Sequence, residues 1–486
     1  MARSKRCGGG STVTVEIDLL PLVNATVTAP AGCGKTELIA DALRRNSSPK
    51  PILVLTHTNA GVAALRGRLD KTRVPSSAYR LSTIDGWAIR LISTFPTRSG
   101  LDPEVLRIAT PATDYPAIRV AASRLLSGRH VHDVLAANYS KLIVDEYQDC
   151  TVPQHELVCH ASTVLATVIL GDPLQAIFGW PGNEPADWTV DVCGRFPVAG
   201  ELQTPWRWRN AGTDDLGRWL LQIRSQLQAG ASIDLGSAPG QVEWVHLDGT
   251  DDEGKRRRAA LTNAPDPQAK VIILGDNRPT THRRIASQTP GAITVEAVDL
   301  RDLVEFAQTL DFSKPDAALQ QVLEFAGELM NGVGVADVLQ RVQVLLRGTV
   351  RKGPSDIERA ALAFRDAANV KTAAELLSTI SASPGVRAYR TGVLRAAFRA
   401  LSQCDDTPGN SFAEAAIRVR EQNRLVGRPL ANRSVGSTLL LKGLEAEVAV
   451  VLYADAMDAR NLYVAMTRGS KKLVVCSRSK IITPVN

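Results

Sequence analysis

Short runs of apolar and β-branched residues alternate with helical patterns along the first part of the chain. Four such runs predict buried strands: 25–28, 51–56, 142–144 and 167–170. Apolar residues recur at helical spacing near 37–45 and 61–69, after the first and the second run. Strands that alternate with helices are typical of a parallel sheet with crossover helices. We therefore predict an α/β domain with a parallel sheet in this part of the chain.

A second set of strands and helices follows further along. Three more runs have the composition of buried strands: 271–274, 448–453 and 472–476. Between the first two of them the chain is rich in Ala, Leu and Arg, and helical spacing recurs in 300–310, 317–330 and 373–380. This pattern predicts a second α/β domain that a helical insertion interrupts. The charged segment 248–267 is expected to be a solvated loop or linker.

Composition narrows the class of protein. The 486 residues are 44% hydrophobic and 22% charged, as in an ordinary globular protein. No apolar run is long enough to predict a transmembrane helix, and the seven cysteines form no Cys-x-x-Cys pair. We therefore expect no membrane partner and a cytoplasmic location. The formal charge of +7 fits a phosphate-backbone partner, although a bland basic surface would give the same value.

The segment 29–36, APAGCGKT, follows the first predicted strand and leads into the first helical pattern. A strand, a glycine-bearing loop, Lys-Thr and a helix form a cradle for a nucleoside triphosphate. The backbone of Ala31, Gly32, Cys33 and Gly34 would surround the phosphates. Lys35 would reach the β- and γ-oxygens, and the Thr36 hydroxyl would ligate Mg²⁺.

Acidic residues follow the third predicted strand, at 145–149. Asp145 is a candidate Mg²⁺ ligand, and Glu146 can orient and deprotonate an attacking water. An acidic turn at a sheet edge is the alternative interpretation. Gln148 adds a polar group that could couple this site to the next element.

Polar and aromatic residues follow the fourth predicted strand. Gln175 is placed to sense the γ-phosphate, and Phe178 and Trp180 bring two rings beside it. Bases stack on aromatic rings without sequence preference, by about 1–3 kcal/mol per base. Aromatic residues near a strand are more often part of the core, so the motif alone leaves both roles open.

Eight motifs in order carry a resemblance to a known family. They are APAGCGKT (29–36), THTNAGVAALRGRL (56–69), LSTIDGWAIRLI (81–92), VDEYQDC (144–150), LGDPLQAIFGW (170–180), LQTPWRWRN (202–210), STLLLKGLEAEVAVV (437–451) and NLYVAMTRGSKKLVV (461–475). This order and spacing resembles the UvrD/Rep/PcrA-type helicases of superfamily 1A.

The resemblance implies a fold and a division of the chain. The fold class is α/β, with two RecA-like P-loop NTPase domains built on parallel sheets and small helical insertions. The implied division is a lead-in (1–24), RecA-like domain 1 (25–93 and 140–198) with a reduced insertion (94–139), and RecA-like domain 2 (199–297 and 428–486) with a second reduced insertion (298–427).

The resemblance also implies residue roles. Lys35, Thr36, Asp145, Glu146 and Gln175 would form the catalytic and Mg²⁺-binding set. From the later motifs, Trp206 would stack on the base of the nucleotide, Arg207 and Arg468 would reach the γ-phosphate, and Glu445 would contact the ribose. An arginine that reaches a transferring phosphoryl group is worth about 10³–10⁵ in rate. A surface ion pair is the alternative role for Arg207. The residues that the resemblance implies would contact single-stranded DNA are His57, Thr58, Asn59, Thr83, Phe178 and Trp180.

Three departures from the family bear on function. Relatives carry a glutamine about twenty residues before the P-loop lysine that selects adenine, but here the first glutamine of the chain is Gln148. GTP and other NTPs are therefore alternatives to ATP. His57 replaces an aromatic phenylalanine, and Leu439 replaces a histidine. Both insertions are also shorter than the accessory domains on which unwinding depends in relatives.

These features leave several functions open. The first is an ATP-driven 3′→5′ translocase or helicase on single-stranded or tailed DNA. The second is a DNA-stimulated NTPase that acts with a partner nuclease, as the resemblance to the helicase-like subunit of Gabija-type antiphage systems suggests. A nucleic-acid-binding scaffold with an inactive motor is disfavoured because each part of the phosphoryl-transfer machinery is present. A nucleotide kinase would lack the aromatic and arginine motifs.

Overall fold

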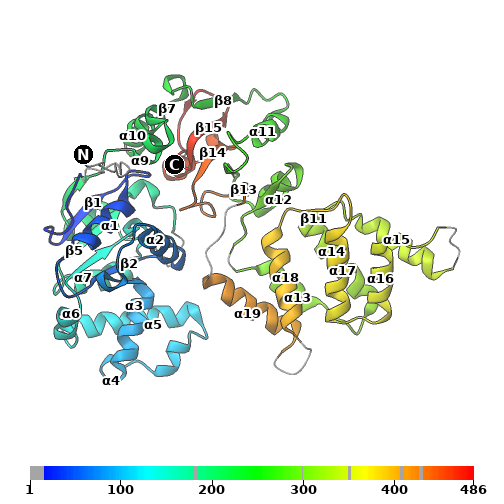
Figure 1. The fold of residues 1–486 in the computed structure, drawn as a ribbon, viewed down its shortest axis with the longest axis horizontal. Helices are drawn as coiled ribbons and strands as arrows, with labels where there is room; N and C mark the ends of the chain where they lie inside the picture. The colour runs from blue at the N-terminus through cyan, green and yellow to red at the C-terminus, as the bar shows by residue number, and fades with distance from the viewer. Residues whose placement is uncertain are drawn as a thin grey trace, which may run out of the picture. The chain divides into compact units, whose positions relative to one another are not determined.

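The computed structural model describes residues 16–179, 184–297, 299–348, 352–404, 410–425 and 431–485. The chain divides into two compact units, Met1–Trp206 and Arg207–Asn486. Each unit is built around one six-stranded sheet in which every pairing is parallel (Figure 1). The two α/β domains predicted from the sequence are therefore confirmed.

The first sheet has the strand order β3-β2-β4-β5-β1-β6. Its strands are β1 (Ala25–Thr28), β2 (Ile52–Thr56), β3 (Tyr79–Thr83), β4 (Lys141–Val144), β5 (Thr167–Gly171) and β6 (Val198–Glu201). The four central strands are buried at every position and match the four predicted runs closely. The two edge strands, β3 and β6, are partly exposed and polar, so no apolar run in the sequence predicts them.

The predicted boundary between residues 198 and 199 falls inside β6. This strand pairs with β1, so the first sheet continues to Glu201 and the first unit to Trp206. The boundary is corrected because an exposed edge strand carries little hydrophobic signal of its own.

Helices of the first unit connect these strands. They are α1 (Lys35–Arg45), α2 (Asn59–Lys71), α3 (Ile84–Thr94), α4 (Pro96–Ser99), α5 (Pro111–Ser127), α6 (His132–Asn138), α7 (Val152–Ala161) and α8 (Cys193–Arg195). Helix α5 lies within the predicted insertion 94–139, yet it buries Ile118 and Leu125 in the same core as the sheet. The Arg119 guanidinium also pairs with Asp85 on α3 at 2.7 Å. This insertion is thus part of the first unit's core.

The end of the lead-in packs on the first sheet. Leu19 is fully buried, and the Lys141 ammonium donates hydrogen bonds to the backbone carbonyls of Leu20 and Leu22 at 3.1 and 2.5 Å. Burial lowers the pKa of Lys141. Asp18 pairs with Arg45 at the end of α1 at 2.8 Å. Residues 16–24 are therefore fixed by polar contacts that a hydrophobic pattern does not reveal.

The second sheet has the strand order β10-β13-β9-β14-β15-β8. Its strands are β8 (Val242–His246), β9 (Val271–Leu274), β10 (Ala292–Thr294), β13 (Arg433–Gly436), β14 (Ala446–Val451) and β15 (Gly469–Ser477). Two short antiparallel pairs join β7 (Ile233–Asp234) to β16 (Ile481–Ile482) and β11 (Met330–Asn331) to β12 (Arg387–Ala388). The sheet is flanked by α9 (Trp206–Ala211), α10 (Asp214–Gln228), α11 (Asp252–Ala260), α12 (Pro279–Gln288) and α20 (Ala459–Met466).

Helix α11 corrects the prediction of a solvated loop at 248–267. The Asp251 carboxylate accepts a hydrogen bond from the Gly254 backbone N–H and caps the helix. Ala259 and Ala260 are buried against the second sheet. These two alanines are the only apolar side chains of the helix, so the sequence shows no helical pattern of apolar residues there.

Helices form a bundle between β10 and β13, as predicted for the second insertion. They are α13 (Arg301–Thr309), α14 (Pro315–Leu329), α15 (Val335–Leu346), α16 (Asp356–Asp366), α17 (Val370–Ala382), α18 (Thr391–Gln403) and α19 (Phe412–Leu425). Helices α14, α16, α17 and α18 lie side by side (Figure 1). Their facing apolar residues form a single core, in which Phe306 and Phe325 stack at 3.9 Å between ring centroids.

A buried arginine joins this bundle to the second sheet. Arg390, 1% exposed, precedes α18, and its guanidinium holds both carboxylate oxygens of Glu296, just after β10, at 2.8 and 3.1 Å. It also pairs with Asp302 on α13, which contacts Arg283 on α12. Burial raises the pKa of Glu296, but Arg390 more than offsets this effect, so the net shift is downward. The Glu296 carboxylate therefore stays charged, and its pair with Arg390 holds the connection between bundle and sheet.

Replacing this arginine should destabilise the second unit. Arg390→Ala leaves two carboxylates without their buried partner, so we expect the free energy of unfolding to fall by about 3–5 kcal/mol. Arg359→Ala is the matched control, because it removes an exposed pair with Asp356 and should cost about 0–1 kcal/mol. Urea titration followed by circular dichroism compares the two variants. Equal effects would show that the buried network contributes nothing beyond a surface ion pair.

Candidate functional site

The P-loop joins β1 to α1, at the carboxyl edge of the first sheet. Gly32 and Gly34 have φ values of 72° and 87°, which L side chains rarely adopt, and α1 begins at Lys35 directly afterwards. A Cβ atom at Gly34 would lie 3.0 Å from Cδ1 of Trp206. The Trp206 indole therefore packs on the phosphate loop, and any residue other than glycine at position 34 would meet it.

Strands β4 and β5 end at the same edge, since all strands of this sheet run parallel. Asp145 and Glu146 follow β4, and the Lys35 ammonium lies 2.9 Å from Asp145 Oδ1 and 2.5 Å from Glu146 Oε1. Burial by itself lowers the pKa of Lys35, but the two carboxylates more than offset this and raise it. Burial and the neighbouring Glu146 raise the pKa of Asp145, while Lys35 opposes them. One protonated lysine thus partly compensates the charge of two close carboxylates.

A chain of hydrogen bonds extends from Glu146 to the end of β5. Glu146 has a φ of 54°, a rare conformation for a non-glycine residue. Its Oε2 accepts a 2.6 Å hydrogen bond from the Gln148 amide, whose oxygen accepts one from the Asp172 backbone N–H at 3.1 Å. Gln175 in turn donates to Asp172 Oδ2 at 3.1 Å. Gln148 thus occupies the coupling position that the sequence indicated, and Gln175 reaches the same network.

Thr36 has a neighbour that the sequence analysis missed. A guanidinium nitrogen of Arg68, on α2, donates to the Thr36 hydroxyl at 3.3 Å. Positive charge at this position would lie beside a triphosphate held by the loop. Arginine on a crossover helix is common, so the sequence alone gave no reason to single it out.

The predicted single-strand contacts divide into two groups. Thr58 and Thr83 cap α2 and α3, their hydroxyls accepting from the backbone N–H groups of Gly61 and Gly86 at 3.0 and 2.9 Å. Asn59 is the exposed first residue of α2. Both helices thus begin at the carboxyl edge of the sheet, where helix N-termini favour anionic groups.

His57 and Phe178 lie together, with ring centroids 5.8 Å apart. Gln154 donates through its amide nitrogen to Asp85 at 3.1 Å, so its oxygen accepts from His57 Nδ1 at 3.2 Å. The same Asp85 pairs with Arg119. Trp180 lies outside the described residues. The structure therefore brings together one of the two predicted aromatic residues and the histidine.

The arginines predicted from the later motifs lie in the second unit. Arg207 donates to the Thr467 carbonyl at 2.6 Å and pairs with Glu445 at 2.5 Å, so two residues expected at the nucleotide are in contact with each other. Arg468 is 3% exposed, and its guanidinium donates to the Val464 carbonyl at 2.8 Å. The expected ion-pair alternative for Arg207 is thus observed, in the form of a pair between two candidate site residues.

Trp208 is a second aromatic residue of this motif that the sequence analysis did not assign. It is 1% exposed, and its indole N–H donates to the Gly469 carbonyl at 2.8 Å. The Arg207 guanidinium lies 5.2 Å from its ring centroid. Trp208 thereby fixes the strand after Arg468 to the helix that carries Arg207.

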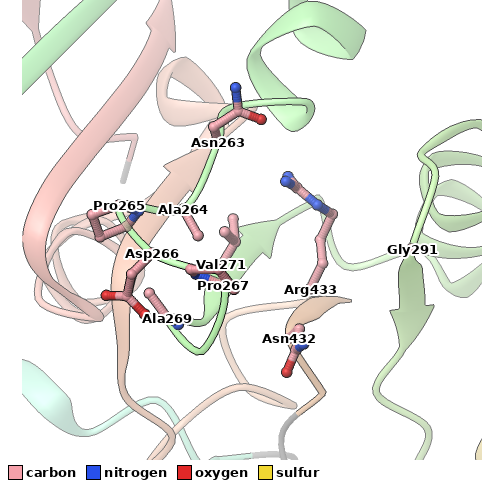
Figure 2. A pocket seen from close by; sticks show the side chains of 10 residues that line it. All are labelled: Asn263, Ala264, Pro265, Asp266, Pro267, Ala269, Val271, Gly291, Asn432 and Arg433. Carbon is pink, nitrogen blue, oxygen red and sulfur yellow. Dashed lines mark hydrogen bonds between the residues drawn. The ribbon is translucent and has the colours of Figure 1, made fainter.

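A pocket of about 540 Å³ lies at the other edge of the second sheet (Figure 2). Val271 and Arg433, the first residues of β9 and β13, line it together with Asn263 and Asn432. The Arg433 guanidinium is already engaged by the carbonyls of Ala260 and Thr262 at 2.5 and 2.9 Å. Ligands of open α/β sheets bind at the carboxyl ends of strands, so this pocket is not part of the candidate site.

Among the described residues, no group of three or more His, Cys, Asp or Glu side chains could hold a metal ion. Mg²⁺ beside a nucleotide takes only one or two protein ligands and completes its shell with phosphates and waters. The Asp145 carboxylate and the Thr36 hydroxyl fit that requirement. In the same part of the chain, no helix is both long and apolar enough to span a bilayer.

The glycine loop after β1, the Lys35 ammonium and the two carboxylates after β4 have the arrangement of a P-loop nucleotide-binding site. Residues 17–181 match the family described as AAA domain, a stretch that holds the P-loop, Asp145, Glu146 and Gln175. The Gabija protein GajB of Bacillus cereus is 26% identical over 196 residues, which are 33% of this chain and 39% of that protein. The match thus spans about two fifths of GajB.

A solved structure, the Pif1 helicase from Candida albicans, aligns with 96% of this chain and 93% of its own. Its sequence identity is 12% and the TM-score is 0.39.

The hydrogen bonds that join Gln148 to Glu146 and to Asp172, here called the Gln148 bridge, can be tested directly. Gln148→Ala removes the amide that contacts both the Glu146 carboxylate and the Asp172 N–H, so we expect NTP turnover to fall about 10- to 100-fold. Steady-state phosphate release measures this loss. Gln222→Ala, at an exposed position of α10, is the control and should leave turnover unchanged. Full activity of Gln148→Ala would refute a coupling role for the bridge.

Proposed function

We propose that the chain is a DNA-dependent ATPase that moves 3′→5′ along single-stranded or tailed DNA, as a helicase of the UvrD type. The observation that carries this proposal is the contact of Lys35 with both Asp145 and Glu146. A lysine, a metal-binding aspartate and a catalytic carboxylate are the parts that phosphoryl transfer to water requires. The direction of movement derives from the motif resemblance alone.

The residues of the first unit have separate proposed roles. The loop 31–36 holds the triphosphate, and Lys35 turns from the two carboxylates to the β- and γ-oxygens. Thr36 and Asp145 hold Mg²⁺, which neutralises charge on the phosphates when it is bound. Glu146 then orients the attacking water and accepts its proton. Gln175 contacts the γ-phosphate, and the Gln148 bridge holds Glu146 in place.

The second unit supplies charge in this proposal. Arg207 and Arg468 reach the γ-phosphate, and Glu445 contacts the ribose while Trp206 stacks on the base. A guanidinium stabilises the charge that develops on the transferring group. Arg207 would then exchange its contact with Glu445 for a phosphate, which supports a hydrolysis step that waits for the second unit.

Nucleic acid would bind at the carboxyl edge of the first sheet. His57 and Phe178 offer neighbouring rings for stacking, and the N-termini of α2 and α3, with Thr58, Asn59 and Thr83, offer backbone donors to phosphates. The net charge of +7 supports a polyanionic partner.

A second candidate function has its own support. The short insertion 94–139 is absorbed into the core of the first unit, which leaves little of the accessory domain used for unwinding in the resembled family. Together with the likeness to GajB, this favours a DNA-stimulated NTPase that acts with a partner nuclease and unwinds little by itself.

Turnover of variants tests the catalytic assignment. Lys35→Ala should abolish hydrolysis, because it removes the ammonium that would reach the β- and γ-oxygens. Glu146→Gln should lower kcat about 10²- to 10⁴-fold, since it removes the general base. Glu37→Gln, at an exposed position of α1, is the control and should hydrolyse normally. Unchanged turnover in Lys35→Ala would overturn the whole scheme.

The same assay separates the two candidate functions. Addition of single-stranded DNA should stimulate turnover in both cases. Displacement of a strand from a 3′-tailed duplex is expected only for the autonomous helicase. Stimulation without displacement would support the nuclease-coupled NTPase and exclude unaided unwinding.

Nucleotide choice is a further expected outcome. Because no glutamine precedes Gln148, the adenine base lacks the amide that selects it in the resembled family. We expect kcat/KM for GTP within about tenfold of the value for ATP, a difference of about 1.4 kcal/mol. Competition between the two nucleotides measures this ratio. A preference for ATP of a thousandfold would mean that another group reads the base.

A further inference from the structure

A pocket of about 400 Å³ lies along β3, the edge strand of the first sheet. Three arginines from three different elements line it: Arg66 on α2, Arg80 on β3 and Arg90 on α3. None of these residues belongs to the nucleotide site. Three guanidinium groups from separate elements line one pocket, and this arrangement indicates a binding site.

Two of the three guanidinium groups form no polar contact with any residue that the structure describes. Arg80 donates to the carbonyls of Ser76 and Tyr79 at 3.1 and 2.9 Å. In the ranges that the structure describes, no hydrogen bond or ion pair engages the side chains of Arg66 and Arg90. The pocket also has one carboxylate, Asp70, which likewise forms no ion pair there. The balance of three positive charges to one negative charge favours an anionic ligand.

The remaining walls suit a phosphodiester chain better than a bare ion. The Ser82 hydroxyl can donate to a phosphate oxygen, and the half-buried Tyr139 offers an aromatic surface. Strand β3 pairs only with β2 on one side, so its outer edge presents backbone N–H groups along the same line. Positive charge combined with an aromatic surface is typical of sites that bind single-stranded nucleic acid along its backbone.

The pocket also lies next to the proposed strand-binding edge. Ser82 directly precedes Thr83, where β3 ends and α3 begins, and Arg90 lies further along the same helix. A strand that passes Thr83 and continues over the edge of the sheet would therefore reach Arg90, Arg80 and Arg66. An acidic protein segment could also pair with arginines. The position of the pocket beside the proposed DNA-binding edge favours DNA as the ligand.

We propose that this pocket binds phosphates of single-stranded DNA beyond Thr83. It would extend the DNA-binding surface, here called the track, from the carboxyl edge of the first sheet around the edge of the first unit. The inference depends on the proposed function, because it takes the carboxyl edge of the sheet as the path of the strand. Arginine suits the task because its planar fork of donors matches phosphate oxygens. The pocket would hold the strand without reading its sequence.

The test is a double variant, Arg66→Gln with Arg90→Gln, which keeps polar side chains and leaves the core intact. Its control removes two exposed arginines elsewhere in the first unit, Arg107→Gln with Arg124→Gln. Binding of fluorescent oligothymidylates of about 4 to 16 nucleotides is followed by anisotropy at several salt concentrations. NTP turnover without DNA should be the same in all three proteins.

We expect the pocket variant to bind the longest oligonucleotides about tenfold more weakly and the shortest ones normally. Its salt dependence, the slope of log K against log salt, should fall by about 1.4, since each phosphate contact with a single strand contributes about 0.7. The control should match the wild type in both quantities, because its arginines lie outside the pocket.

Two outcomes would overturn the inference, and they are distinguishable. If the wild type binds single strands and the pocket variant binds every length with the same affinity and slope, the pocket is not part of the track, although the proposed function stands. An acidic protein segment would then be the better ligand. If the wild type binds no single-stranded DNA at all, both the proposed function and the inference fail.

Discussion

The site depends on one electrostatic arrangement, the Lys35 ammonium between the carboxylates of Asp145 and Glu146. Two carboxylates this close repel each other, which favours the protonated form of one of them. Lys35, at 2.9 and 2.5 Å from their oxygens, opposes this effect, although burial and Glu146 still leave the pKa of Asp145 raised. A triphosphate with its metal offers a rival set of charges for all three groups. Binding of nucleotide would therefore exchange one set of opposite-charge contacts for another.

The parallel sheet is what makes this arrangement possible. Because every strand of the first sheet runs in the same direction, the loops after β1, β4 and β5 meet at one edge, although long stretches of chain separate them. The Gln148 bridge then links the loop after β4 to the loop after β5, through contacts of 2.6 and 3.1 Å. The positive φ of Glu146 turns its side chain into this network, a strain that the surrounding hydrogen bonds support.

Arginines take several distinct roles across the chain. Arg390 fixes the helical bundle to the second sheet through buried carboxylates, a structural role that its 1% exposure supports. Arg207 is held by Glu445 and by the Thr467 carbonyl, a smaller set of contacts that another anion can replace. Arg66 and Arg90 are exposed in the pocket beside β3, where no described residue pairs with their side chains. These roles differ in how many partners each guanidinium group has and in how deeply those partners are buried.

The sequence by itself determined the buried elements and the chemistry at their ends. The four central strands of the first sheet, three strands of the second, several helices and the motifs from Lys35 to Arg468 follow from local runs and spacings, because burial of a whole strand or helix face leaves a hydrophobic pattern. The exposed edge strands β3 and β6 and the weakly anchored α11 left no such pattern, so the structure had to reveal them. Only the tertiary structure decided which polar groups meet: Arg68 with Thr36, Arg207 with Glu445, His57 with Gln154. Such contacts join segments that no local pattern relates, because hydrogen bonds depend on the positions of atoms in space.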